Sequence, residues 1–313
     1  MNRKLILLII PILLLFSCSE FIEPELKQEQ TELLAPKNGL ESTTYLQTFW
    51  WEYAKGASYY QLQVVEPSFA APARLVLDTI IHLNKFSFTL APGKYQWRVN
   101  AMNSTSQGPF STRSLTIHPS SIKEQQLLPE TPADGHITNQ SPLNFRWPNL
   151  YGATEYELQI DANGFADPNN PGTTIKTSNL ATNYVLTNEG SYQWRIRAIN
   201  ATESSKWSAI RKFVYDKTAP AKPQLSSPSN NQIVQSPVRL QWNSITDAKN
   251  YELIIYRSDG TTPFSANFPM QLTEASYNFS QGATGEKYFW KVSAIDKAGN
   301  KSEASESYSF TIQ

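Results

Sequence analysis

The chain contains very little cysteine, histidine or net charge, and each shortage excludes a class of protein. Its 313 residues include one cysteine and three histidines, and 27 basic residues balance 27 acidic ones. A lone cysteine cannot form a disulfide within the chain, so the fold must be stabilised by its hydrophobic cores. Nucleic-acid binding requires a concentrated basic surface, which a neutral chain does not supply. We therefore expect no nucleic-acid partner.

Sequence motifs for catalysis and metal binding are also absent. The histidines His82, His118 and His136 are scattered, without the HExxH spacing of zinc enzymes. The sequence has no GxSxG nucleophile elbow, GxxxxGK phosphate loop or GxGxxG fingerprint. Residues 161–169 have oxygen-bearing side chains typical of either a calcium loop or an ordinary turn, and we interpret them as a turn. We expect a non-enzymatic protein with no metal and no cofactor.

The single cysteine, Cys18, follows a short apolar segment at the amino-terminus. Residues 1–4 include two basic side chains, and residues 5–16 are almost wholly apolar. A basic start, an apolar segment and a small residue at the cut site are typical of a secretory signal. A membrane-spanning helix would need roughly 20 apolar residues. Residues 1–17 are therefore predicted to be a signal peptide.

The end of this segment, Leu15-Phe16-Ser17-Cys18, resembles a bacterial lipobox. The resemblance implies cleavage after Ser17 and a lipid such as palmitate on Cys18, which anchors the chain in the outer membrane, at its periplasmic face or at the cell surface. Residues 19–32 contain five glutamates and one lysine, so we interpret 18–32 as a lipidated cysteine with a flexible acidic tether. A 14-residue coil reaches roughly 20 Å.

The rest of the chain repeats itself three times, with a period near 96 residues. Trp51, Trp147 and Trp242 are each followed by a tyrosine nine residues later, and a second tryptophan lies 46 to 48 residues after the first. The second tryptophan lies in a segment that alternates large apolar with polar residues, such as Tyr95–Ala101. Such alternation is typical of a strand with one buried face. The sequence thus predicts an all-β chain of tandem β-sandwiches.

These residues resemble the fibronectin type III domain, which has an immunoglobulin-like fold. Such domains have a tryptophan on the second strand, a tyrosine that opens the third strand, and a late run of alternating residues that here corresponds to Tyr95–Asn103. The resemblance also implies a hydroxyl bond from Tyr95 to the preceding corner. It places three domains at 33–117, 128–215 and 223–313, with a polar connector at 118–127.

Two aromatic residues of the first repeat stand where the other repeats have polar ones. Trp50 aligns with Arg146 and Gln241, and Tyr59 likewise aligns with polar residues. An outward aromatic side chain can stack on a sugar ring or anchor a partner protein, or it can be a lone surface residue. In the fibronectin arrangement Trp50 and Tyr59 belong to different sheets. They are our candidate ligand or partner contacts.

Charged residues on the outer faces of adjacent predicted strands suggest cross-strand ion pairs. We expect Glu157 to pair with Arg195, and Glu252 to pair with Lys291. Such pairs at a surface stabilise a fold by less than about 1 kcal/mol each. They are expected to be structural and not part of a site.

Two functions remain for a non-catalytic lipoprotein of the cell envelope. In the first, the tandem domains are a protein–protein interaction or scaffold module that docks onto envelope proteins through sheet faces and edges. In the second, the chain is a glycan-binding accessory lipoprotein of a polysaccharide-uptake system that uses Trp50. In addition, Asp78-Thr79-Ile80 is similar to an O-glycosylation acceptor of bacteria of the Bacteroidetes type.

Overall fold

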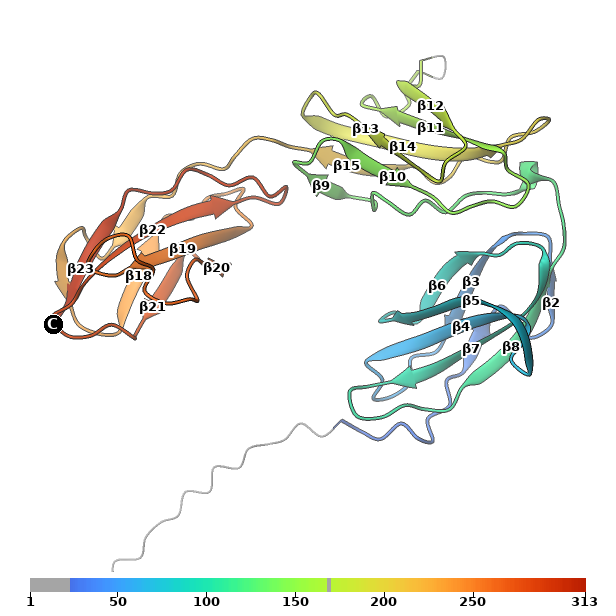
Figure 1. The fold of residues 1–313 in the computed structure, drawn as a ribbon, viewed down its shortest axis with the longest axis horizontal. Coiled ribbons are helices and arrows are strands. Elements are labelled where there is room, and N and C mark those ends of the chain that lie inside the picture. Colours follow the sequence, from blue (N-terminus) through green and yellow to red (C-terminus); the bar gives the residue numbers. More distant parts are fainter. Residues whose placement is uncertain (1–22, 168–169) are drawn as a thin grey trace, which may run out of the picture. The chain divides into compact units, whose positions relative to one another are not determined.

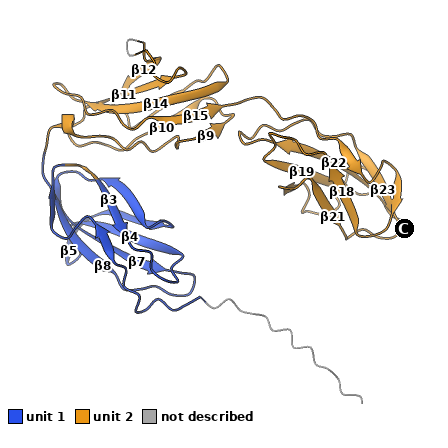
Figure 2. Ribbon diagram, turned by 180° about the vertical axis from the view of Figure 1, so that it is seen from behind, with its two compact units in different colours: residues 1–43, 47–119 blue, residues 44–46, 120–313 orange. Residues whose placement is uncertain are grey.

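The structure of the chain is a computed structural model that describes residues 23–167 and 170–313. Figure 1 shows its ribbon, and Figure 2 colours its two compact units, one with residues up to 43 and 47–119, the other with residues 44–46 and 120–313. The sheets associate in pairs as three β-sandwiches, of which the second and third belong to the second unit. The predicted all-β fold of tandem sandwiches is confirmed.

The first sandwich combines a three-stranded and a five-stranded sheet (Figure 1). The smaller sheet has the order β1 (Leu33–Ala35), β3 (Leu46–Trp51), β6 (Lys85–Thr89). The larger sheet has the order β2 (Leu40–Ser42), β8 (Ser111–Ile117), β7 (Gly93–Met102), β4 (Tyr59–Ser68), β5 (Ala71–Ile81). The strand β2 runs parallel to β8, and the other pairs in this sheet are antiparallel.

The second and third sandwiches repeat this plan with one shorter edge strand in the larger sheet, and the smaller sheet of the second has two strands instead of three. In the second, β10 (Leu143–Arg146) pairs with β13 (Ala181–Tyr184), and the larger sheet has the order β12 (Thr173–Thr177), β11 (Glu155–Asp161), β14 (Gly190–Ile199), β15 (Arg211–Tyr215), β9 (His136–Thr138). In the third, the sheets are β16 (Leu225–Ser227), β18 (Val238–Trp242), β21 (Ser276–Phe279), and β17 (Gln232–Val234), β23 (Tyr308–Ile312), β22 (Lys287–Ile295), β19 (Asn250–Tyr256), β20 (Met270–Leu272).

Each sandwich encloses its own aromatic core. The repeated tryptophans are at most 4% exposed, and they are Trp51, Trp97, Trp147, Trp194, Trp242 and Trp290. An aromatic side chain buries 150–250 Å², so each tryptophan contributes roughly 4–6 kcal/mol of hydrophobic free energy. Five of these side chains lie at inward positions of strands, and Trp147 directly follows β10, so the period-two pattern of the sequence could identify them.

Two tyrosines in each repeat fix the backbone beside the core. The ring of Tyr60 lies 5.4 Å from that of Trp51, and its hydroxyl accepts the backbone N–H of Ala54 at 2.8 Å. Tyr156 and Tyr251 make the same bond with the residue six positions earlier. The hydroxyl of Tyr95 donates to the carbonyl of Ala91 at 2.8 Å, so the predicted corner is confirmed.

The structure differs from the sequence analysis before the first sandwich, where a flexible tether was expected. Residues 23–32, which we call the first strap, pack against the sandwich. Leu26 is fully buried and Thr31 is 2% exposed. The N–H of Leu26 donates to Ser106 at 3.0 Å, and the side-chain amide of Asn103 donates to the carbonyl of Pro24 at 2.8 Å. Burial of apolar side chains and these hydrogen bonds offset the conformational entropy that the segment loses when it becomes ordered. The acidic composition alone predicted disorder, because composition does not show these contacts.

The expected polar connector also packs against a sandwich as a second strap, residues 120–127. It contains the short 3₁₀ helix η1 (Ile122–Glu124), the single helix within the described residues. Ile122 is 3% exposed and Leu127 is 2% exposed, and both align with strap residues of the first repeat at the 96-residue period. The N–H of Lys206 donates to the carbonyl of Gln125 at 2.9 Å. Straps are therefore part of the repeat.

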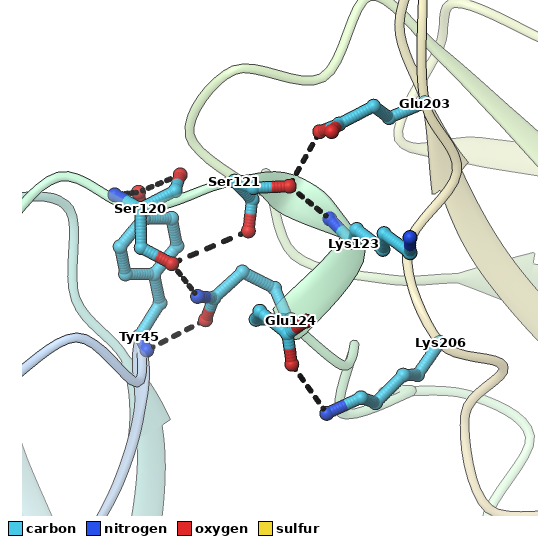
Figure 3. Close-up of polar contacts among 8 residues, drawn as sticks. Tyr45, Ser120, Ser121, Lys123, Glu124, Glu203 and Lys206 are labelled. Carbon is cyan, nitrogen blue, oxygen red and sulfur yellow. Dashed lines mark hydrogen bonds and ion pairs between the residues drawn. The ribbon is translucent and has the colours of Figure 1, made fainter.

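Polar contacts close the amino-terminal end of the second strap (Figure 3). The hydroxyl of Ser121 accepts the N–H of Lys123 at 3.1 Å and donates to the Glu203 carboxylate, so this residue caps η1. Glu124 pairs with Lys206 at 3.2 Å. On the other side, the N–H of Tyr45, which belongs to the second unit, donates to the side chain of Gln125 at 2.8 Å.

Candidate functional site

Trp50 lies on the outer face of β3, between two fully buried neighbours. Its side chain is 46% exposed, whereas Phe49 and Trp51 are 0% exposed. Thr48 lies on the same exposed face of β3 as Trp50. Its hydroxyl is joined to that of Ser87 by a hydrogen bond of 2.8 Å. The result is an exposed indole beside hydroxyl groups on the outer face of the sheet, and this indole can stack on an apolar face of a ligand.

Tyr59 begins β4, in the other sheet of the same sandwich, as the sequence analysis expected. Its hydroxyl donates to the carbonyl of Asn103 at 3.0 Å, and its ring contacts His82 edge-on at a centroid distance of 6.0 Å. Asn103 is the residue that holds the first strap. Tyr59 and Trp50 are therefore not brought together, and Tyr59 packs a loop instead of presenting a free ring.

The long edge strand β5 is a third candidate, which the sequence analysis did not identify. It has 11 residues, whereas the corresponding edges of the second and third sandwiches, β12 and β20, have five and three. Within the described residues, β5 pairs with β4 on one side and with no strand on the other. Leu75 and Ile80 are 58% and 50% exposed. The signal in the sequence was the apolar run at 75–81, broken by one charge.

The residues of the glycosylation-like triplet lie within β5. The carboxylate of Asp78 accepts hydrogen bonds from Gln61 at 2.7 Å and Gln63 at 2.8 Å on the neighbouring strand. Thr79 is half-buried and lies opposite the buried Leu62. The charge of Asp78 is thus engaged on the outer face, while Thr79 lies on the core side of the edge.

Arginine side chains on the larger sheets are stacked between aromatic rings. The Arg98 guanidinium lies 4.0 Å from the ring centre of Phe69 and 4.1 Å from that of Phe110. In the second sandwich, Arg195 and Arg197 each lie 4.5 Å from the ring of Trp207. Burial, and then the neighbouring Arg197, lower the pKa of the Arg195 guanidinium. These stacks stabilise the outer face. Because arginine side chains already cover these aromatic rings, the rings are not free to stack on a ligand.

The two expected ion pairs have different partners. Glu157 lies opposite Arg197 and pairs with it at 2.8 Å, whereas Arg195 donates to Gln159. Glu252 pairs with Lys301, and the Lys291 ammonium lies 5.4 Å from the ring of Tyr256. The predicted strands are adjacent, but the register is two residues away from the one assumed.

Cys18, the predicted lipid-attachment residue, lies outside the described residues. No helix within the described part of the chain is long and apolar enough to cross a membrane. Among the same residues no cluster of three or more histidine, cysteine or acidic side chains could hold a metal ion. In the turn that begins at Asp161, the carboxylate accepts the N–H of Phe165, as in an ordinary turn.

The glycine at position 108 indicates that the first strap lies very close to the sandwich. Gly108 stands where the other repeats have Ser205 and Ser302, whose hydroxyls accept a backbone N–H at 2.9 Å. A Cβ on Gly108 would lie 2.6 Å from the carbonyl oxygen of Glu29 and 3.0 Å from that of Leu26. The first strap therefore approaches so closely that only glycine fits.

Comparison with known proteins gives similarity to structures only. No family model matches the chain. No curated protein matches it either. The crystal structure of the chicken CNTN1 FN1–FN3 domains is similar over 91% of this chain and 100% of that one, at 16% identity and a TM-score of 0.45. The fibronectin(III)-like modules of Clostridium thermocellum CbhA are similar over 60% of this chain and 94% of theirs, at 11% identity and a TM-score of 0.41.

Proposed function

We propose that this chain is a non-catalytic lipoprotein of the outer membrane, anchored through Cys18, that binds an extended segment of another envelope protein along β5. The free edge of β5 carries the proposal. An unpaired strand edge presents a row of backbone N–H and C=O groups, and an added strand satisfies them. Proteins normally keep such edges short or charged, as β12 and β20 are here.

The side chains of β5 suit a docked strand. Leu75 and Ile80 supply exposed apolar surface at both ends of the segment, and the intervening Asp78 is already bonded to its own sheet. Main-chain bonds would give affinity, and the two apolar side chains would give selectivity. Pro72 and Arg74 interrupt the edge at its amino-terminal end, which limits pairing to the part from 75 onward.

The test is a pair of edge variants in the lipidated chain. The double variant Leu75→Lys/Ile80→Lys places two charges on the free edge, and Thr174→Lys places one on the short edge β12 as a matched control. We expect a stoichiometric membrane protein to co-purify with the unmodified chain and the control but not with the double variant. Retention of that partner by the double variant, or its absence from the unmodified chain, contradicts the proposal.

A glycan-binding function is the second candidate, and the exposure of Trp50 favours it. A glycan array with the mature chain and its Trp50→Ala variant tests it, with Tyr151→Ala as the control because Tyr151 is 52% exposed. Binding that Trp50→Ala abolishes and Tyr151→Ala retains would establish this function. For both candidates, incorporation of labelled palmitate that is lost in Cys18→Ala tests the anchor.

A further inference from the structure

The amino-terminal end of the first strap is bonded to two loops at one end of the first sandwich. Glu23 is its first residue, and the Glu23 carboxylate accepts the N–H of Ser104 at 2.7 Å and its hydroxyl at 3.0 Å. Asn103 donates both to Pro24 at 2.8 Å and to the carbonyl of Gly56 at 3.2 Å. These bonds join the strap to the loops 52–58 and 103–106, which we call the basal loops.

The strap packs closely against these loops. A Cβ on Gly56, which has φ of +82°, would lie 2.4 Å from the ring of Pro24. The backbone N–H of Leu26 also donates to the hydroxyl of Ser106, and the hydroxyl of Ser111 donates to the carbonyl of Thr31. The strap is therefore fixed at both of its ends, and it cannot act as a spacer.

A fixed strap leaves a very short connection to the lipid. Only five residue steps separate Cys18 from Glu23, and an extended chain spans at most about 3.6 Å per residue, or about 18 Å in total. A free tether from Cys18 to Glu32 could extend to about 50 Å by the same measure. This five-step connection, which we call the spacer, thus keeps the basal loops within reach of the lipid headgroups.

We propose that the docked first strap holds the basal loops of the first sandwich against the membrane surface, where Tyr53 contacts the lipid headgroups. This inference rests on the proposed lipid on Cys18. Tyr53 is 63% exposed on the loop that receives the strap, and a tyrosine with an apolar body and a polar tip suits a membrane interface. The partner is a lipid surface, because Cys18, the residue proposed to carry the lipid, lies only five residue steps before the docked Glu23.

The charges of the basal loops predict which lipids matter. On the basal loops Glu52 is acidic and Lys55 is basic, and the adjoining strap adds Glu23, Glu25 and Lys27, so the surface is not polybasic. Attraction to anionic lipids needs a cluster of basic residues. We expect the same orientation on neutral phosphatidylcholine vesicles as on vesicles that contain phosphatidylglycerol, because the spacer length and Tyr53 determine it.

Two labelled positions in the lipidated full chain test the orientation. If Cys18 is acylated, a newly introduced cysteine is the single free thiol. Lys55→Cys places a fluorophore on a basal loop, and Ala70→Cys places one at the opposite end of β4, whose ten residues span about 33 Å. In vesicles with nitroxide-labelled headgroups, we expect severalfold stronger quenching at 55 than at 70, and Tyr53→Ser should weaken it.

Release of the strap provides the decisive control. In Leu26→Asp the strap should detach from the sandwich, so quenching at 55 should fall to the value at 70, while the exposed Lys27→Ala variant should behave like the parent. Equal quenching at 55 and 70 in a vesicle-bound parent chain overturns the orientation and leaves the anchor intact. A chain that incorporates no palmitate and does not float with vesicles overturns both the anchor and the orientation.

Discussion

The first and third sandwiches have equivalent cores but different edges. In the first, β4 and β5 form a hairpin of ten and 11 residues, whereas the third has seven residues in β19 and three in β20. Within β5 only Ile81 is buried. The core therefore constrains the inner strands and places almost no constraint on the length of the edge. A free edge of this length is a feature of one sandwich, not of the fold.

The straps differ between sandwiches in a related way. The first strap requires Gly108, and the second strap lies beside Ser205, which keeps its hydroxyl bond to the backbone. Before the third sandwich, Pro220 and Pro223 are buried, and the carbonyl of Asp216 accepts a hydrogen bond from Asn300 at 2.9 Å. Each sandwich thus covers the same loop with a different local sequence.

The largest effect is expected when the first strap loses its buried side chain. Leu26→Ala should lower the free energy of unfolding of the first sandwich by about 2–4 kcal/mol, because a fully buried leucine leaves a cavity. Lys27→Ala, whose side chain is 74% exposed, should change it by less than about 0.5 kcal/mol. Guanidinium unfolding gives the values, and hydrogen exchange over 23–32 shows whether the strap is the site of the loss. Unchanged protection there would mean that the strap is not docked.

Gly108 and Ser205 occupy the same position beside the straps of the first and second sandwiches, and giving each the other's residue type should destabilise its sandwich. Gly108→Ser should cost about 1–3 kcal/mol, because the new side chain collides with two strap carbonyls. Ser205→Gly should cost about 1–2 kcal/mol, because the N–H of Ala198 loses a buried acceptor. Both values come from guanidinium unfolding of the mature chain. If Gly108→Ser were neutral, the strap would not need the close approach.

The ion pairs should differ between the second and third sandwiches. The Glu157 side chain is 8% exposed and the Glu252 side chain is 24% exposed. Glu157→Gln should therefore cost about 1–2 kcal/mol, because the amide can keep a hydrogen bond to Arg197 but loses the charge that strengthens it. Glu252→Gln should cost less than about 1 kcal/mol. Raising the salt concentration should weaken only the Glu252 pair, and equal costs in thermal unfolding would show that burial does not separate them.

The smallest effect concerns the turn that replaces the long hairpin in the third sandwich. Hydrogen bonds from Thr262, and then from the N–H of Thr261, lower the pKa of Asp259 to about 2. A lowered pKa in the folded state means that the carboxylate stabilises the fold above about pH 4 and that this contribution is lost as the pH falls through 2. Carbon-detected NMR titration should give this pKa, with Asp259→Asn as the control. A titration near 3.8 would show an open turn.

The sequence predicted the cores because alternation is a local property of a strand. Trp97 and Trp290 were assigned inward positions from their neighbours alone, and both are fully buried. The pairing of Glu157 could not be predicted in this way. Register depends on loop lengths and on the partner strand, and a shift of two residues keeps the same face while changing the partner from Arg195 to Arg197.

The candidate site was predicted less well than the fold. The exposure of Trp50 followed from its position between two core residues, and the structure places it on the outer face of β3. Tyr59 was grouped with it by the same alignment, but a bond to Asn103 gives it a packing role. The free edge of β5 could not be predicted, because a single sequence does not show which strand lies last in a sheet.

By itself, the sequence determined the repeat, the inward residues and the all-β class, because each depends on spacing along the chain. The tertiary structure alone decided that the acidic residues 23–32 are docked, that Gly108 faces their carbonyls, and that β5 ends its sheet. The first two features arise from contacts between residues about 80 positions apart, such as that between Leu26 and Ser106. A local pattern contains no information about which distant backbone will supply the partner for a buried group.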